Sequence, residues 1–207
     1  MGNVIEKFDR LAAGYREHDY ADPDRYFARK AELVVLLPPR IPAGSSVLDL
    51  GCGDGALAPA LARYGVDYTG VDLSSGMIDA ARRREPRFTF VHASMEDFMP
   101  DHPVDVTVSM RAFFYPADVR AFFTRVQSYT RLKFVFDFDP RVHSPSDIRD
   151  DLAAAGFNEV TFRRLLLPQR KKIPLPVQAA LFRLEPTPVA SLLIRVGFPA
   201  RTLVTAV

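Results

Sequence analysis

The segment from Ser46 to Phe138 alternates short apolar runs with stretches long enough to form helices. The apolar runs are Ser46–Leu50, Tyr68–Val71, Phe88–Val91, Val104–Ser109 and Lys133–Phe138. Residues 56–64, 74–84 and 117–129 lie between these runs, and residues 146–155 follow the last one. A strand that is followed by a helix and then by another strand favours parallel pairing, with the helix on a face of the sheet. The pattern therefore predicts a doubly wound α/β fold with helices on both faces of a mostly parallel sheet.

The chain on either side of this segment has a different pattern. Residues 1–40 are charged and helical in their spacing, which predicts an amino-terminal helical cap. After a helix stop at Gly156, residues 158–166 and 200–207 are expected to be the last two strands of a seven-stranded sheet. Residues 167–199 between them predict a helical insertion. We expect a single domain over residues 1–207, with a ligand-binding core at residues 46–157.

The composition limits the class of protein. The chain has 27 Lys and Arg residues against 25 Asp and Glu, so its formal net charge of +2 does not call for a nucleic-acid partner. Its one cysteine, Cys52, rules out an intramolecular disulfide framework, and a cytoplasmic location fits best. The longest charge-free stretches, residues 173–182 and 186–194, are far shorter than the roughly 20 residues that span a bilayer.

A glycine-rich turn follows the first apolar run. Gly51, Gly53 and Gly55 separate that strand from a helix, and such a turn lets the backbone approach a ligand closely. The spacing Gly-x-Gly-x-Gly differs from the dinucleotide fingerprint, which disfavours a pyrophosphate cofactor. Asp72 ends the second strand, where its carboxylate can accept hydrogen bonds from ribose hydroxyls. The alternative is that Asp72 only caps the helix that begins near Ser74.

Two motifs, Val47–Gly55 and Gly70–Arg82, resemble those of the class I S-adenosylmethionine-dependent methyltransferases, specifically the small-molecule group. The resemblance covers about residues 8–157 and implies S-adenosylmethionine as the cofactor. Relative to the family pattern, Ser94 replaces an Asp that recognises the adenine edge, so that contact should be weaker. The resemblance implies that Tyr15 closes over the cofactor and that Asp49, Gly51, Cys52 and Gly53 lie beside its methionine part. It implies that Asp72 binds the ribose, and that Leu73, Met77, Ser94 and Met95 contact the adenine. Met110 is a further cofactor-binding residue by the same resemblance.

The end of the fourth strand faces the methyl group in this family. Residues 110–113 lack the Asn-Pro-Pro-Tyr type of motif of nucleic-acid amino methyltransferases, so no nucleic-acid substrate is expected. Only Asp137 and Asp139 are available for a magnesium site of the catechol methyltransferase type, so we expect no metal. Arg111 is positioned to steer an acceptor carboxylate or phosphate. Phe113 and Phe114 either line the acceptor pocket or belong to the core.

Methyl transfer needs a base only when the acceptor must lose a proton. Tyr115 is the first candidate for a polar catalytic role, and His18 and His143 are the plausible bases.

These patterns predict methyl transfer to a small aromatic or lipophilic acceptor at oxygen or nitrogen. An alternative is a membrane-borne quinone or lipid precursor as the acceptor. Five cations between Arg163 and Lys172 lie beside apolar segments and suggest peripheral membrane contact, although a solvated hairpin tip followed by helices that pack on the sheet is favoured over it. A second alternative is a regulatory protein that binds the cofactor without turnover, suggested by Ser94 and by the absence of a His near position 114. The sequence leaves the oligomeric state open.

Overall fold

A computed structural model describes residues 2–198 and 200–207 of the chain. Met1 and Pro199, the last residue of the predicted insertion, lie outside the described residues. The strands are β1 (Ser46–Leu50), β2 (Asp67–Asp72), β3 (Thr89–His92), β4 (Val104–Met110), β5 (Thr130–Phe138), β6 (Val160–Leu165) and β7 (Arg201–Ala206). The longer helices are α1 (Gly2–Leu11), α3 (Pro23–Leu36), α5 (Ser75–Arg84), α6 (Val119–Tyr129), α7 (Pro145–Ala154), α8 (Leu175–Leu184) and α9 (Pro188–Arg195), and the shorter ones are η1 (Ala12–Gly14), α2 (Tyr15–Asp19) and α4 (Ala58–Ala62).

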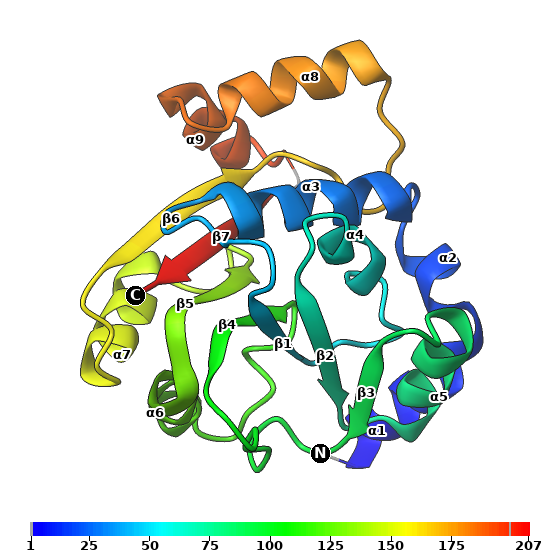
Figure 1. The fold of residues 1–207 in the computed structure, drawn as a ribbon. Coiled ribbons are helices and arrows are strands. Elements are labelled where there is room, and N and C mark those ends of the chain that lie inside the picture. The colour runs from blue at the N-terminus through cyan, green and yellow to red at the C-terminus, as the bar shows by residue number, and fades with distance from the viewer. Residues whose placement is uncertain (1, 199) are drawn as a thin grey trace.

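The strands form one seven-stranded sheet in the order β3-β2-β1-β4-β5-β7-β6 (Figure 1). Strands β1 to β5 are parallel, and β7 runs antiparallel to both of its neighbours. After β1, the chain forms β2 and β3 on one side of β1, and then crosses to form β4 on the other side of β1. The topological switch point therefore lies between β1 and β4, where open α/β sheets bind their ligands. The predicted doubly wound, mostly parallel sheet is confirmed.

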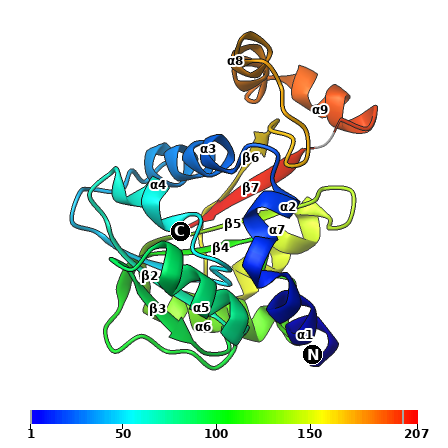
Figure 2. The ribbon, with the colours of Figure 1, turned by 90° about the vertical axis from the view of Figure 1, so that its right-hand side faces the viewer.

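Helices cover both faces of the sheet (Figure 2). Apolar residues of α3, α4 and α5 pack with β1 and β2 into one core cluster on one face. On the other face, α6 and α7 pack against β4 and β5, and phenylalanines such as Phe123, Phe134 and Phe136 form the centre of that core. Because central parallel strands are buried on both faces, their near-continuous apolar runs were the strongest signal in the sequence.

Helix starts follow the expected capping chemistry. The side chains of Asp22, Ser74 and Asp118 each accept a hydrogen bond from a backbone N–H in the first turn of the following helix. Gly156, after α7, has a φ of 100° and ends that helix as predicted. Strand β5 begins at Thr130, three residues before the predicted start, because α6 passes directly into it at Tyr129.

The amino-terminal helices have two different roles. Helix α3 packs against α4 and buries Phe27, Ala31 and Val34. It therefore belongs to the helical layer on one face of the sheet, and the prediction that all of residues 1–40 form a cap is wrong for this helix. Helix α1 contacts α5 and is held there by Asp9, whose carboxylate accepts a hydrogen bond from the Gly76 N–H at 3.0 Å. Within the described part of the chain, the cap consists of α1, η1 and α2.

The predicted insertion between the last two strands contains α8 and α9, which stand beyond α3 at the margin of the molecule in both views (Figures 1 and 2). They share a small apolar cluster built on Leu166, Leu181, Ala190 and Ala200. In the described part of the chain, none of the helices combines the length and the apolar character needed to cross a membrane.

Candidate active site

A cavity of about 250 Å³ lies at the carboxyl ends of β1, β2 and β4. The loop after β1, the end of β2, the loop after β3 and the end of β4 contribute to its lining, and α1 and Tyr15 close it from the amino-terminal side. The cavity therefore lies at the switch point of the sheet, where the fold predicts a ligand.

The glycine loop forms the floor of this cavity. Gly51 and Gly53 line it with φ values of 78° and 56°, a conformation that residues with a Cβ rarely adopt. A Cβ on Gly51 would lie 2.4 Å from the Cβ of Ala112 at the end of β4. A Cβ on Gly53 would have Cε1 of Tyr15 as its nearest neighbour, at 4.0 Å. Because Gly51 and Gly53 have no side chains, the ends of β1 and β4 can approach each other, and space remains next to the ring of Tyr15.

Asp72 lines the cavity at the end of β2. Its two oxygens accept hydrogen bonds from the N–H groups of Gly53 at 2.8 Å and Ser74 at 2.9 Å. These bonds fix the carboxylate between the glycine loop and the start of α5, while burial raises its pKa. A carboxylate offers about four lone-pair sites, so two remain for ligand hydroxyls. The cap of α5 is Ser74, whose hydroxyl accepts from Met77 N–H, so the alternative role of Asp72 as that cap does not apply.

The predicted adenine-side residues come together in the same cavity. Leu73, Met77, Ser94 and Met95 all contribute to its lining. The Ser94 hydroxyl accepts a hydrogen bond from the Glu96 N–H at 3.1 Å, which orients the loop after β3. The apolar residues beside the Asp72 carboxylate would suit a nucleoside, and the open backbone at Gly53 would suit an attached chain. The residues present therefore fit S-adenosylmethionine.

Asp49 and Cys52 lie near the glycine loop but outside the cavity lining. Oδ2 of Asp49 accepts a hydrogen bond from the Tyr68 hydroxyl at 2.7 Å, and burial raises the pKa of Asp49 to about 7. Its second oxygen, Oδ1, is buried without a hydrogen-bond partner among the described residues. Cys52 packs against Gly70 of β2, where a Cβ would lie 2.8 Å from Sγ. Asp49 and Cys52 are therefore buried residues that support the glycine loop without lining the cavity.

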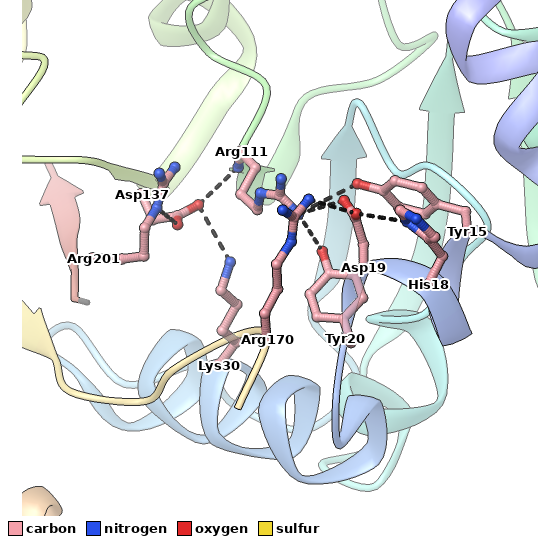
Figure 3. A network of polar contacts seen from close by, with 9 residues as sticks. All are labelled: Tyr15, His18, Asp19, Tyr20, Lys30, Arg111, Asp137, Arg170 and Arg201. Atoms are coloured by element: carbon pink, nitrogen blue, oxygen red, sulfur yellow. Dashed lines mark hydrogen bonds and ion pairs between the residues drawn. The ribbon is translucent and has the colours of Figure 1, made fainter. Parts of the chain in front are cut away.

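Arg111 lines the cavity at the end of β4 and is the centre of a network of polar contacts there (Figure 3). Its Nη1 donates to the hydroxyl of Tyr20 at 3.0 Å and to that of Tyr15 at 3.4 Å, and it lies 3.6 Å from Oδ2 of Asp19. The other carboxylate oxygen of Asp19 accepts from Arg170 at 3.0 Å. Arg111 thus ties the end of β4 to α2, and Asp19 ties α2 to the insertion.

Asp137, at the end of β5, anchors the backbone of Arg111. Its Oδ1 accepts from the Arg111 N–H at 2.7 Å and lies 3.3 Å from Nζ of Lys30. Its Oδ2 accepts from Nε of Arg201 at 2.8 Å. Burial favours the neutral acid, but the charges of Lys30 and Arg201 and the hydrogen bonds outweigh it and lower the pKa of Asp137. Asp137 is therefore a charged structural residue between two buried or half-buried cations.

The aromatic candidates divide between cavity and core. Phe114 and Tyr115 line the cavity and are each 38% exposed, whereas Phe113 is buried between β5 and α6, packed against Phe123 and Phe136. Burial raises the pKa of Tyr115, so its phenol stays protonated near neutral pH. Tyr115 is therefore suited to donate a hydrogen bond and unsuited to remove a proton.

The two candidate bases lie outside the cavity lining. His18 is 70% exposed in its side chain and contacts Asp19. His143 packs against the rings of Phe113 and Phe114, with centroids 5.2 Å and 6.0 Å away. Among the described residues that line the cavity, none is a histidine.

Some lining residues were missed from the sequence. Ile5 and Phe8 of α1 line the cavity, as do Glu96 and Pro116. Phe8 contacts both Tyr15 and Tyr115 edge-on, at centroid distances of 6.0 Å and 5.9 Å. The helical spacing of Phe8 and Tyr15 indicated a shared face, but nothing in the sequence indicates that this face meets the end of β4.

Comparisons with known proteins agree with this geometry. Residues 47–132 match a model that describes a methyltransferase domain. The chain is 31% identical to a trans-aconitate 2-methyltransferase of Enterobacter sp. (strain 638) over 134 residues, 64% of this chain and 51% of that protein. It is 35% identical to a ubiquinone biosynthesis O-methyltransferase of Thiobacillus denitrificans over 121 residues, 52% of this chain and 50% of the relative. The match thus spans about half the length of these two relatives.

Solved structures support the fold. Magnesium protoporphyrin IX methyltransferase from Synechocystis PCC 6803, with bound S-adenosylmethionine, superposes with a TM-score of 0.64 at 18% identity, covering 88% of this chain and 78% of that one. Phosphoethanolamine N-methyltransferase 2 of Haemonchus contortus gives a TM-score of 0.62 at 17% identity, covering 86% and 52%.

The strand order, the glycine loop and the position of Asp72 agree with the match to a methyltransferase domain over residues 47–132. The chain therefore has a methyltransferase-like domain in this region, and it shares its fold with solved methyltransferases, one of which has S-adenosylmethionine bound.

Proposed function

We propose that this protein transfers a methyl group from S-adenosylmethionine to a carboxylate oxygen of a small acid with an aromatic or lipophilic body. The observation that carries the proposal is the guanidinium of Arg111, which lines the cavity among aromatic side chains. This proposal narrows the broader class of small apolar acceptors methylated at oxygen or nitrogen.

On the cofactor side, the residues that would hold S-adenosylmethionine are Asp72 for the ribose hydroxyls, Leu73 and Met77 for the adenine faces, and Gly51 and Gly53 beside the methionine part. When bound, the cofactor supplies an electrophilic methyl group on a sulfonium centre. Ser94 and the backbone of Met95 would receive the adenine edge, with a hydroxyl in place of a charged group.

On the acceptor side, Phe8, Phe114, Tyr115 and Pro116 offer an apolar wall. Nη1 of Arg111 is engaged with Tyr15, Tyr20 and Asp19. Among the described residues, none accepts a hydrogen bond from its Nε or Nη2. These donors are therefore free to bind a carboxylate, and the contacts of Nη1 keep the guanidinium in place for it.

The described lining residues include no histidine, and the carboxylate of Glu96 is engaged with the Ala117 N–H at 2.7 Å, which favours an acceptor that needs no base. A carboxylate is already ionised at neutral pH and needs only orientation toward the methyl group and exclusion of water. Tyr115, whose raised pKa keeps it protonated, can donate a hydrogen bond to the second acceptor oxygen. The relatives named for trans-aconitate are, by their names, enzymes for a carboxylic acid.

The experiment measures formation of S-adenosylhomocysteine with a panel of aromatic and aliphatic carboxylic acids, each paired with its primary amide. We expect turnover with one or more acids and none with the matched amides. Arg111→Gln should raise the KM for the acid roughly 10- to 100-fold, because a charge-assisted hydrogen bond contributes about 1.5–3 kcal/mol. Arg111→Lys should recover part of that loss.

The dissociation constant of S-adenosylmethionine, measured in both Arg111 variants, controls for damage to the cap. It should stay within about threefold of the original. Turnover of phenols or amines with no turnover of any acid would overturn the carboxylate proposal. Tight cofactor binding with no turnover across acids, phenols, amines and quinols would favour the non-catalytic regulatory alternative.

A further inference from the structure

Helix α8 is docked onto the body of the protein partly through polar groups, beside the ring of Phe182, which packs against Arg29. Gln178 and Leu181 of α8 are buried, and so is Glu185 directly after the helix. Glu185 accepts a hydrogen bond from the Leu166 N–H at 3.1 Å with one oxygen and pairs with Arg29 of α3 through the other. A helix that packs on a protein normally buries its apolar side and exposes its polar side. In α8 this arrangement is partly reversed.

The outward sides of α8 and α9 are correspondingly apolar. Leu175 is 63% exposed, Leu192 60% and Val196 72%. Of the eleven large hydrophobic residues that are exposed in the described chain, five lie on these two helices or directly after α9: Leu175, Val177, Val189, Leu192 and Val196. We call these five residues, with the exposed cations between 170 and 195, the α8–α9 surface.

The charges of the α8–α9 surface have one sign. Arg170, Lys171, Lys172, Arg183 and Arg195 are all exposed. The one acid between residues 166 and 198 is Glu185, which is buried and paired with Arg29. Helical spacing places Leu192 and Arg195 on one side of α9, with Val196 directly after the helix, and the exposed Lys171 and Lys172 lie a few residues before the exposed Leu175 and Val177 of α8. Cations therefore flank the exposed apolar side chains on both helices.

We propose that the α8–α9 surface binds an anionic lipid membrane peripherally. Exposed apolar side chains flanked by Lys and Arg match the interfacial region of a bilayer, where the apolar groups enter the headgroup boundary and the cations contact anionic headgroups. A second copy of the chain would bring like charges together, which disfavours it as the occupant. The exposed large hydrophobic residues of this surface are all Leu and Val, without the aromatic residues that are enriched at protein interfaces, which disfavours a protein partner. The inference does not depend on the proposed methyl transfer.

Vesicle flotation of the full chain without cofactor tests the proposal. The protein should float with vesicles of phosphatidylcholine containing phosphatidylglycerol and stay at the bottom with pure phosphatidylcholine. High salt should weaken the binding. Lys171→Glu combined with Lys172→Glu should lower the bound fraction roughly tenfold or more, because each cation near the surface contributes to the attraction. Leu192→Ser combined with Val196→Ser should also lower it.

The matched control combines Arg63→Glu with Arg83→Glu, which changes the net charge equally on residues outside the α8–α9 surface. This control should float nearly as well as the original protein. Equal flotation of the Lys171/Lys172 variant and the control would overturn the proposal, and so would no binding to anionic vesicles at low salt. A dimer in sedimentation velocity that Leu192→Ser with Val196→Ser dissociates would also overturn it, by identifying a second copy as the occupant.

Discussion

The backbone N–H of Arg111 donates a hydrogen bond to Oδ1 of Asp137 at 2.7 Å, across the neighbouring ends of β4 and β5. Arg111 has a φ of 62°, a conformation that costs a residue with a side chain about 1–3 kcal/mol. This bond and the contacts of the guanidinium hold the strained residue at the cavity. The acceptor side of the site therefore depends on a buried carboxylate that does not itself line the cavity.

Asp137→Asn should destabilise the protein strongly. The substitution leaves Lys30, which is fully buried, and Arg201 without their shared counter-charge, and loss of one partner of a buried pair costs about 3–5 kcal/mol. Urea unfolding followed by circular dichroism measures the change. Asp139→Asn, two residues further on, breaks an exposed pair with Arg141 and should cost about 1 kcal/mol or less. Similar losses in the two variants would contradict the account of Asp137.

Asp49 predicts a specific pH dependence of stability. Its folded pKa is raised to about 7, above the value of about 3.9 in an unfolded chain, so between these values the folded state binds more protons. The contribution of Asp49 to the free energy of unfolding should therefore fall as pH rises from about 4 to about 7, by an amount on the order of a few kcal/mol. Asp49→Asn removes this titration, so its stability relative to the original protein should rise over the same window. A difference that does not vary with pH would contradict the raised pKa.

Gly51→Ala should disrupt the loop far more than the same change at Gly44. Both glycines have a positive φ, 78° and 84°, so both variants carry a backbone cost of about 1–2 kcal/mol. Only at Gly51 would the new Cβ clash, 2.4 Å from Ala112, whereas nothing lies within 4 Å at Gly44. The clash should add about 1–3 kcal/mol and weaken cofactor binding. Thermal unfolding and calorimetry compare the variants, and equal losses would refute the close approach of β1 and β4.

The sheet and the part of the cavity lining at the ends of β1 and β2 could be predicted because they depend on local signals. Apolar runs separated by helical stretches determine the parallel order, and the spacing of Gly51, Gly53 and Asp72 follows from one strand–turn–helix unit and the next strand. The antiparallel pairing of β7 with β5 and β6 was left open in the sequence, since strand direction depends on contacts between distant segments.

The acceptor side could be predicted only in part, because it is built from long-range contacts. Arg111 was identified from its place at the end of β4, but its partners Asp19 and Tyr20 lie about 90 residues away in the chain. Phe113 and Phe114 are adjacent residues of the same type, yet Phe113 lies in the core and Phe114 lines the cavity. Adjacent residues after a strand can face opposite ways, and composition does not distinguish them.

The most direct test of the central claim is a calorimetric titration with S-adenosylmethionine and S-adenosylhomocysteine, with NADH as the control ligand. We expect micromolar binding of both sulfur compounds and none of NADH. Asp72→Ala should weaken binding at least tenfold, because it removes the carboxylate that we propose to bind the ribose, whereas Asp67→Ala, at the exposed start of the same strand, should bind normally. No binding of either sulfur compound to the folded protein, or equal binding to the two variants, would contradict the account.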